Sequence, residues 1–397
     1  MKKIKILNVF LALIICGSAY AQNQDEVLHS VLLNNKSIQA NNTYLNKLNL
    51  EAKTGLTLNN PTISYLHLWD QNDNTGYTEE FEAKQSFEFP SSYAYKNIIS
   101  NLEIEKTEDR RKLFSIDVLL EAKMACTEII YLKRKKEESN MRANYAMKLV
   151  DNIRTKLQNG YTTQFELDKA LISEMIIQNE YMDISNLLQK KEDHLVELNG
   201  GQAIQLKVIE YPEQPIPESL NALFEHIESI DPLNKLIELE IKIAELNIKL
   251  TRTGSLPEFE VGYKLEKSTL DKFSGVILGM SIPLWQNKNK VSVSKINMDH
   301  MKSNIVQHEN EHYYHIKSIY DDYISASERL SKFQGLWNKL NYLENIEKAL
   351  EEGEISTTEY FLELKTLYEL KDNLLDIEKD YQLLLSQLNK FELLRLL

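Results

Sequence analysis

Residues 159–166 read NGYTTQFE, and residues 352–359 read EGEISTTE. Each segment follows a long stretch without proline: 70 residues separate Pro90 from the glycine of the first segment, and 70 separate Pro283 from the glycine of the second. Because proline breaks helices and glycine weakens them, these spacings predict two long helices that each end in a turn at the glycine. The equal spacing also predicts that the fold is a duplicated unit.

The proline-free stretches have the periodicity of long helices. Apolar residues recur at spacings of three and four, which is typical of a coiled-coil seam. The last segment shows it most clearly, in Leu364, Leu367, Leu370, Leu374, Ile377, Tyr381, Leu384 and Leu388. We expect helices over about 92–157 and 284–351, each ~100 Å long at ~1.5 Å per residue. A second helix after each glycine completes a hairpin.

Both halves of the sequence follow one order of elements. Pro61 and Pro257 open extended stretches, and helices are expected before them over about 24–54 and 218–253. Each half is therefore predicted to contain a helix, two strands, a long helix, a turn and a helix. The predicted organisation is a signal peptide at 1–21, a first repeat at 22–199, a linker at 200–217 and a second repeat at 218–397.

The first residues have the pattern of a secretory signal. Three lysines precede an apolar stretch at 6–15, and residues 19–21 (AYA) form a small-x-small cleavage site, which predicts removal of residues 1–21. A lipoprotein signal that uses Cys16 is the alternative, although Ile15 is bulky where a small residue is expected.

Cleavage would change the formal net charge from −13 to −16. So acidic a chain is a poor candidate for binding nucleic acid. Cys126 would be the one remaining cysteine, which excludes an intramolecular disulfide and favours a small buried apolar side chain. The sequence contains no glycine-rich phosphate loop, GxSxG or CxxC motif. We therefore predict neither a cofactor nor an enzyme.

The extended stretches alternate between apolar and polar residues. The alternation is clear over 81–89, 258–265 and 275–282, and poorer over 62–69. A period of two gives a strand one apolar and one polar face. Two interpretations stay open: hairpins that pack their apolar face on the helices, or strands that face lipid. Lipid admits strands only in closed barrels, and a small barrel needs about eight, so four strands would require an oligomer. Three copies would supply twelve.

This duplicated pattern resembles the TolC-type outer membrane factor family over essentially the whole mature chain. The matching residues are the strand openers at 60–61 (NP) and 256–257 (LP), the strand exit at 279–284 (GMSIPL), and the turns that begin at Gly160 and Gly353. The resemblance implies a mainly α fold with a small β part. Duplicated long helical hairpins would form a periplasmic tube, and four transmembrane β-strands per protomer would give a 12-stranded barrel in a trimer.

The resemblance also implies a function: an outer-membrane channel subunit of a tripartite efflux or secretion system, acting as a passive conduit for drugs, metal ions or other small cargo. Its implied partners are two further copies of itself, a periplasmic adaptor protein, an inner-membrane pump and outer-membrane lipid. One departure is that residues 36–38 (KSI) stand in the first half where the second has Pro232. A periplasmic coiled-coil adaptor is the alternative, but it would have one hairpin and several β-rich modules.

By the same resemblance, the two turns at the far end of the tube would receive the adaptor. The candidate docking residues are Gly160, Tyr161, Thr162, Gly353, Ile355 and Ser356. The competing interpretation is that these residues only reverse the chain, with glycine supplying a positive φ. The candidates for an acidic constriction are Asp168, Glu351, Glu352 and Glu354. A ring of carboxylates from three copies would favour cations, whereas a solvated helix end is the simpler explanation.

Residues 308–312 (HENEH) fit the H-E-x-x-H pattern of zinc metalloproteases. A zinc enzyme also needs a third protein ligand. The best-spaced acid, Glu328, lies 16 residues beyond His312 in the same predicted helix, which is ~24 Å along its axis. The motif therefore does not predict a protease. A weak metal site at His308, His312 and His315 remains the alternative to solvent-exposed histidines.

Overall fold

The computed structural model describes residues 23–69, 71 and 76–397, so the predicted signal peptide and Cys16 lie outside the described residues. Contacts group the chain into two compact units. The first comprises the described part of Met1–Lys36 with Glu121–Glu213 and Arg329–Leu383, and the second comprises Ser37–Leu120, Gln214–Glu328 and Leu384–Leu397. Each predicted repeat contributes to both units, and the repeat boundaries stay a prediction.

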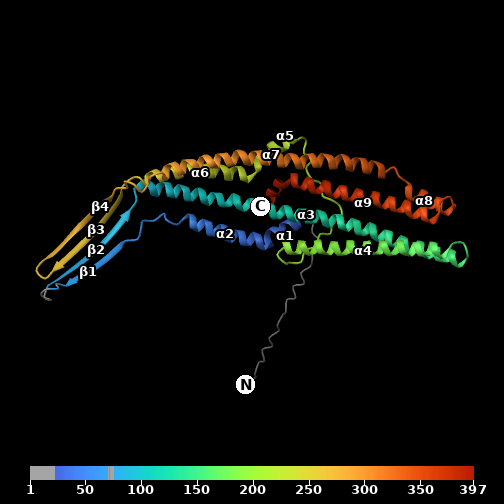
Figure 1. The fold of residues 1–397 in the computed structure, drawn as a ribbon, viewed down its shortest axis with the longest axis horizontal. Helices are drawn as coiled ribbons and strands as arrows, with labels where there is room; N and C mark the ends of the chain where they lie inside the picture. Colours follow the sequence, from blue (N-terminus) through green and yellow to red (C-terminus); the bar gives the residue numbers. More distant parts are fainter. Residues whose placement is uncertain (1–22, 70, 72–75) are drawn as a thin grey trace, which may run out of the picture. The chain divides into compact units, whose positions relative to one another are not determined.

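The two halves of the chain present their elements in the same order (Figure 1). The first half contains α1 (Gln24–Asn34), α2 (Lys36–Ala52), β1 (Thr62–Trp69), β2 (Tyr77–Phe87), α3 (Pro90–Gln158) and α4 (Gln164–Leu198). The second contains α5 (Leu220–Ile230), α6 (Pro232–Thr253), β3 (Glu258–Ser268), β4 (Lys272–Ser281), α7 (Lys290–Trp337), α8 (Tyr342–Glu351), α9 (Thr357–Leu388) and the 3₁₀ helix η1 (Lys390–Leu396). The fold is thus mainly helical with four strands, as predicted.

The single helices predicted over 24–54 and 218–253 are wrong, because each is divided into two. In the first half the break is at Asn35, a buried residue whose Nδ2 donates to the carbonyl of Leu198 at 2.8 Å. In the second half it is at Asp231, whose carboxylate accepts the N–H of Leu233 at 2.8 Å. The Asn35 side chain thus bonds outside its own helix. Asp231 precedes Pro232, which disfavours a helical conformation in the residue before it, and the Asp231 carboxylate caps the start of α6.

The long helix of the first half is confirmed, whereas that of the second half differs from the prediction. Helix α3 is continuous over 69 residues. Helix α7 begins at Lys290 instead of near residue 284, because residues 285–289 form turns in which Asn289 has a φ of 67° and Asn287 donates to the carbonyl of Gly254. It ends at Trp337, two residues after Gly335, and α8 resumes at Tyr342.

The four strands form one antiparallel sheet in the order β1-β2-β3-β4 (Figure 1). The central pair joins the two halves of the chain, with Phe81 opposite Leu265. Strands β1 and β4 are the edges, and within the described residues neither has a second neighbour. The strand predicted over 62–69 coincides with β1.

Helices α3 and α4 run antiparallel in the first unit, where they share an apolar core (Figure 1). Near residue 130 the core contains Ile129, Leu188 and Leu195, together with Leu206 from the linker. Cys126 lies in the same core and is fully buried, and this burial raises its pKa to about 12. The prediction of a small, buried side chain is confirmed.

Candidate functional site

The sheet has one apolar face, and that face is open. The register places most of the apolar side chains of the four strands on it, while Leu66, Leu68, Phe273 and Ile277 lie on the opposite face. Those on the apolar face are Ile63, Tyr65, Phe81, Ala83, Phe87, Phe259, Val261, Tyr263, Leu265, Val276, Leu278 and Met280. Ile63, Val276 and Leu278 are 67%, 72% and 79% exposed. The interpretation in which hairpins pack this face against helices is therefore wrong for the described residues, and a contiguous exposed apolar surface marks a site of contact.

The opposite face of the sheet is charged and cross-linked by ion pairs. Lys264 of β3 pairs with Glu80 of β2 at 3.0 Å and with Glu266 at 3.4 Å. Lys84 of β2 contacts Glu260 of β3 at 3.6 Å. A Cβ at Gly262 would lie 2.9 Å from Cγ of Lys84, so the glycine leaves room for that lysine to cross to the next strand. This face is suited to water.

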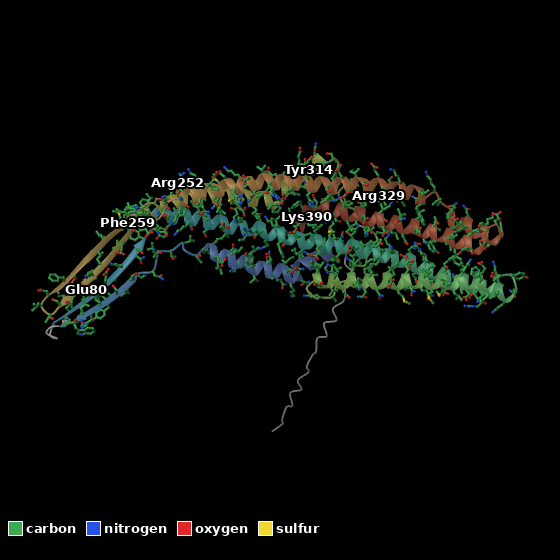
Figure 2. All side chains as sticks on the ribbon, viewed as in Figure 1. Glu80, Arg252, Phe259, Tyr314, Arg329 and Lys390 are labelled. Carbon is green, nitrogen blue, oxygen red and sulfur yellow. The ribbon has the colours of Figure 1, made fainter. Side chains whose placement is uncertain are left out.

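Aromatic rings lie at both ends of the apolar face. At the end near the helices, Phe87 stacks on Phe259 with ring centroids 5.8 Å apart. At the hairpin end, His67 contacts the rings of Trp69 and Tyr77 at 4.7 and 5.8 Å. Figure 2 labels Phe259 and Glu80 near the two ends of the sheet. An apolar band bounded by aromatic rings is typical of strands that cross a membrane.

The two predicted turns have the same backbone geometry. Gly160 and Gly353 have φ values of 78° and 75°. After α3, the N–H of Tyr161 donates to the carbonyl of Lys156, and the N–H of Gly160 donates to that of Leu157. The turn after α8 repeats both bonds at equivalent positions, which makes each a Schellman motif. The interpretation that the glycines reverse the chain is thus confirmed, while docking at these turns stays a prediction.

The other predicted docking residues differ in exposure. Tyr161 is 81% exposed. Thr162 is half-buried, and Ile355 packs against the core cluster around Tyr360. Ser356 caps α9, because its Oγ accepts the N–H of Glu359 at 3.2 Å while the Glu359 carboxylate accepts the N–H of Ser356 at 2.8 Å. These bonds hold the pKa of Glu359 below its usual range.

The predicted acidic residues are exposed at these turns and are partly paired. Glu352 lies 3.7 Å from Lys348, and Asp168 accepts from Gln164 at 2.7 Å. Glu351 and Glu354 are exposed. The turns of the two hairpins are neighbours in the first unit, as Lys169 donates to Thr358 at 2.6 Å. Whether the acids of three copies converge stays a prediction.

Close to the turns, α3, α4 and α9 enclose a groove of about 580 Å³. Its apolar lining includes Leu149, Ile172, Ile176, Phe361, Leu362 and Leu364, and charged lining residues include Lys169, Glu180, Lys365 and Glu369. Ile172 and Ile176 are 61% and 62% exposed. This groove was not predicted from the sequence, in which Ile172 and Ile176, four residues apart in α4, are the signal for it.

Buried polar contacts hold α9 against α3 beside this groove. The guanidinium of Arg142, which is 4% exposed, binds the Asp372 carboxylate through two bonds of 3.0 and 3.1 Å and Glu138 at 3.1 Å. The hydroxyls of Tyr145 and Tyr360 share a hydrogen bond. Burial raises the pKa of Tyr360 to about 12, so this link is uncharged at neutral pH.

The two histidines of the H-E-x-x-H motif share a face of α7. The rings of His308 and His312 stack with centroids 5.6 Å apart, and Nδ1 of His312 lies 3.4 Å from a Glu228 oxygen. His315 is exposed, and Glu328 belongs to the same helix. No three or more His, Cys, Asp or Glu side chains in the described part of the chain are placed to hold a metal ion.

Comparison with solved structures identifies the fold. CusC, crystallised in a study of folding and transmembrane channel formation, is 14% identical with a TM-score of 0.76, over 93% of this chain and 91% of CusC. The CmeC outer membrane channel of Campylobacter jejuni is 14% identical with a TM-score of 0.72, over 93% and 85% of the two chains. The open MtrE outer membrane channel of Neisseria gonorrhoeae is 12% identical with a TM-score of 0.68, over 93% and 88%.

Sequence comparisons add nothing to this, since neither a family model nor a curated protein matches the chain. Among the described residues, no helix has the length and apolar character that crossing a membrane requires.

Proposed function

We propose that this chain, which has the fold of TolC-type outer membrane factors, is the outer-membrane channel subunit of a tripartite efflux system. One observation carries the proposal: a four-stranded sheet whose apolar face is exposed and whose two edge strands lack neighbours among the described residues. CmeC and MtrE are outer membrane channels by their own descriptions, and the open apolar face of the sheet is a physical reason for this chain to be one.

The sheet needs both lipid and partner strands. Its apolar face gains free energy only when it leaves water, and unpaired strand edges are not tolerated in lipid. Since about eight strands are needed to close a small barrel, one copy with four is insufficient. Three copies close a 12-stranded barrel if β4 of each copy pairs with β1 of the next. In that barrel the edge strands gain hydrogen-bond partners, and the apolar face is transferred from water to lipid.

The strand lengths fit a bilayer. The strands contain 8, 11, 11 and 10 residues. A tilted strand of about 9–11 residues crosses the hydrocarbon core. The charged face, with Glu80, Lys84, Glu260 and Lys264, then lines a water-filled lumen, and the aromatic pairs at the two ends lie at the lipid–water boundaries.

The hairpins then extend into the periplasm and receive an adaptor protein. The groove formed by α3, α4 and α9 suits a helical partner, because an apolar floor with charged residues of both signs is the surface that an amphipathic helix recognises. Exposed Tyr161, at the turn next to this groove, adds an aromatic contact. We place the docking surface in this groove and at the two turns, with an inner-membrane pump beyond it. The chain itself acts as a passive conduit.

Conductance in a planar lipid bilayer tests this function. The full chain, purified from membranes as an oligomer, is expected to produce long-lived, water-filled pores that prefer cations, since acids outnumber lysines on the charged face of the sheet. A matched sample with Tyr161→Ala should conduct equally and should lose efflux only in cells, because Tyr161 belongs to none of the four strands. An oligomer that produces no pores contradicts the proposal.

A further inference from the structure

A row of polar side chains crosses the apolar face of the sheet at its hairpin end. The register aligns His67, Glu79, Lys267 and Lys272, one from each strand. We propose that this row, named here the basic row, binds the phosphate group of a lipid headgroup in the outer leaflet. The inference rests on the proposed function, because the barrel is what places this face against lipid.

The charges of the basic row do not cancel. The Glu79 carboxylate is shared by three donors: Lys267 Nζ at 3.5 Å, His67 Nδ1 at 3.4 Å and the Tyr65 hydroxyl at 3.2 Å. Within the described residues, no carboxylate pairs with Lys272, whose side chain is exposed. The row thus contains one carboxylate and two ammonium groups.

Two lysines stand directly opposite each other in this row. The register pairs Lys267 with Lys272. Like charges in a cross-strand pair destabilise a sheet. An anion between the two ammonium groups converts this repulsion into attraction, and a phosphate supplies three acceptor oxygens and up to about two negative charges. The lysines also have stems long enough to extend from the apolar surface toward headgroups.

The neighbouring residues set the depth of the basic row. On its outer side lie Trp69, which is 73% exposed, and Tyr77, whose ring lies 5.2 Å from Lys267 Nζ. On its inner side the next row contains Phe81 and Leu265. Aromatic rings gather where lipid tails meet headgroups. The basic row therefore lies between the apolar band and these rings, and its lysines reach the headgroups by extending outward past the rings.

The other end of the same face provides an internal comparison. There the register aligns Phe87, Phe259 and Met280, and no charged side chain belongs to that row. Since the helices follow the sheet at that end, it faces the periplasm in the proposed orientation. On the lipid face, charged side chains thus occur only at the hairpin end of the strands. In the proposed orientation that end lies in the outer leaflet, so the phosphate must belong to a lipid of the outer leaflet.

Lipid retention by the intact oligomer tests the proposal. We would purify the full chain in neutral detergent, add phosphatidic acid or phosphatidylcholine as probes, and count bound lipids by native mass spectrometry. The test variant is Lys267→Gln with Lys272→Gln. The matched control is Lys264→Gln, which removes a lysine of the same strand on the charged face. Particle mass, measured on the same samples, reports assembly separately.

The wild type and the control should retain phosphatidic acid over phosphatidylcholine, and the preference should weaken with added salt. The double variant should lose about fivefold in affinity per lysine, since a lysine near an anionic surface contributes roughly 1 kcal/mol. Equal retention by wild type and double variant would overturn the proposal and would mean that Lys272 serves only to protect an edge strand. A monomer that binds no lipid would instead overturn the proposed function, and the lipid site with it.

Discussion

Arginine in place of Val276 tests which face of the sheet contacts lipid. Val276 lies midway along β4, opposite Tyr263, and is 72% exposed. If this face were in contact with water, the free energy of unfolding would change by no more than about 0.5 kcal/mol. At the centre of a bilayer, an arginine on the lipid face costs ~2–4 kcal/mol. That range is about thirty- to several-hundredfold in the folding equilibrium of each copy.

The matched control is Ile277→Arg, one residue further along β4. Ile277 lies on the charged face, opposite Gly262 and between the registers of Glu260 and Lys264. Arginine there meets water and a carboxylate, so the cost should stay below about 1 kcal/mol. Urea unfolding in lipid micelles and the fraction assembled in the outer membrane are the assays. Equal effects of the two substitutions, or no effect of Val276→Arg, would refute the assignment of the faces.

Three further substitutions test the helical region. Gly200→Ala should destabilise the fold by about 3 kcal/mol or more, because a φ of 67° costs ~1–2 kcal/mol with a side chain and the new Cβ would lie 2.2 Å from the carbonyl oxygen of Asn34. Gly201→Ala is the control, because Gly201 also has a positive φ but a Cβ there meets no neighbour; the difference between the two variants in thermal unfolding measures the contact with Asn34. Arg142→Met should cost ~3 kcal/mol in denaturant unfolding by leaving Asp372 without its partner, and an unchanged midpoint would show that the pair does not hold α9. The lowered pKa of Glu359 means that its cap stabilises α9 above pH ~4.3 and is lost as pH falls further, so the protection factors for hydrogen exchange at the start of α9, each relative to the intrinsic rate at that pH, should fall in acid, and Glu359→Gln should abolish that dependence.

The sequence predicted those features that depend on local chemistry. Alternation over 62–69 located β1 even though that pattern is the poorest of the four. Glycine at a helix end predicted the Schellman turns at Gly160 and Gly353, because few other residues adopt a positive φ there. The absence of proline and glycine predicted a helix over about 92–157, and α3 spans Pro90–Gln158.

Features that depend on distant contacts could not be predicted. The break at Asn35 needs the carbonyl of Leu198, 163 residues away, to accept its side chain. The delayed start of α7 depends on Asn287 reaching Gly254. The union of the two hairpins into one sheet depends on the β2–β3 pairing, which alternation alone does not encode. The groove depends on how α4 and α9 are placed on α3.

Membrane location and particle mass, measured together, test the central claim most directly. The chain would be expressed from its full sequence, the envelope fractionated, and the detergent-extracted particle weighed with its detergent subtracted. The proposed function predicts that the chain is in the outer-membrane fraction and has the mass of three copies. A water-soluble monomer would contradict it, because the exposed apolar face and the open edges of the sheet would then have neither lipid nor partner strands.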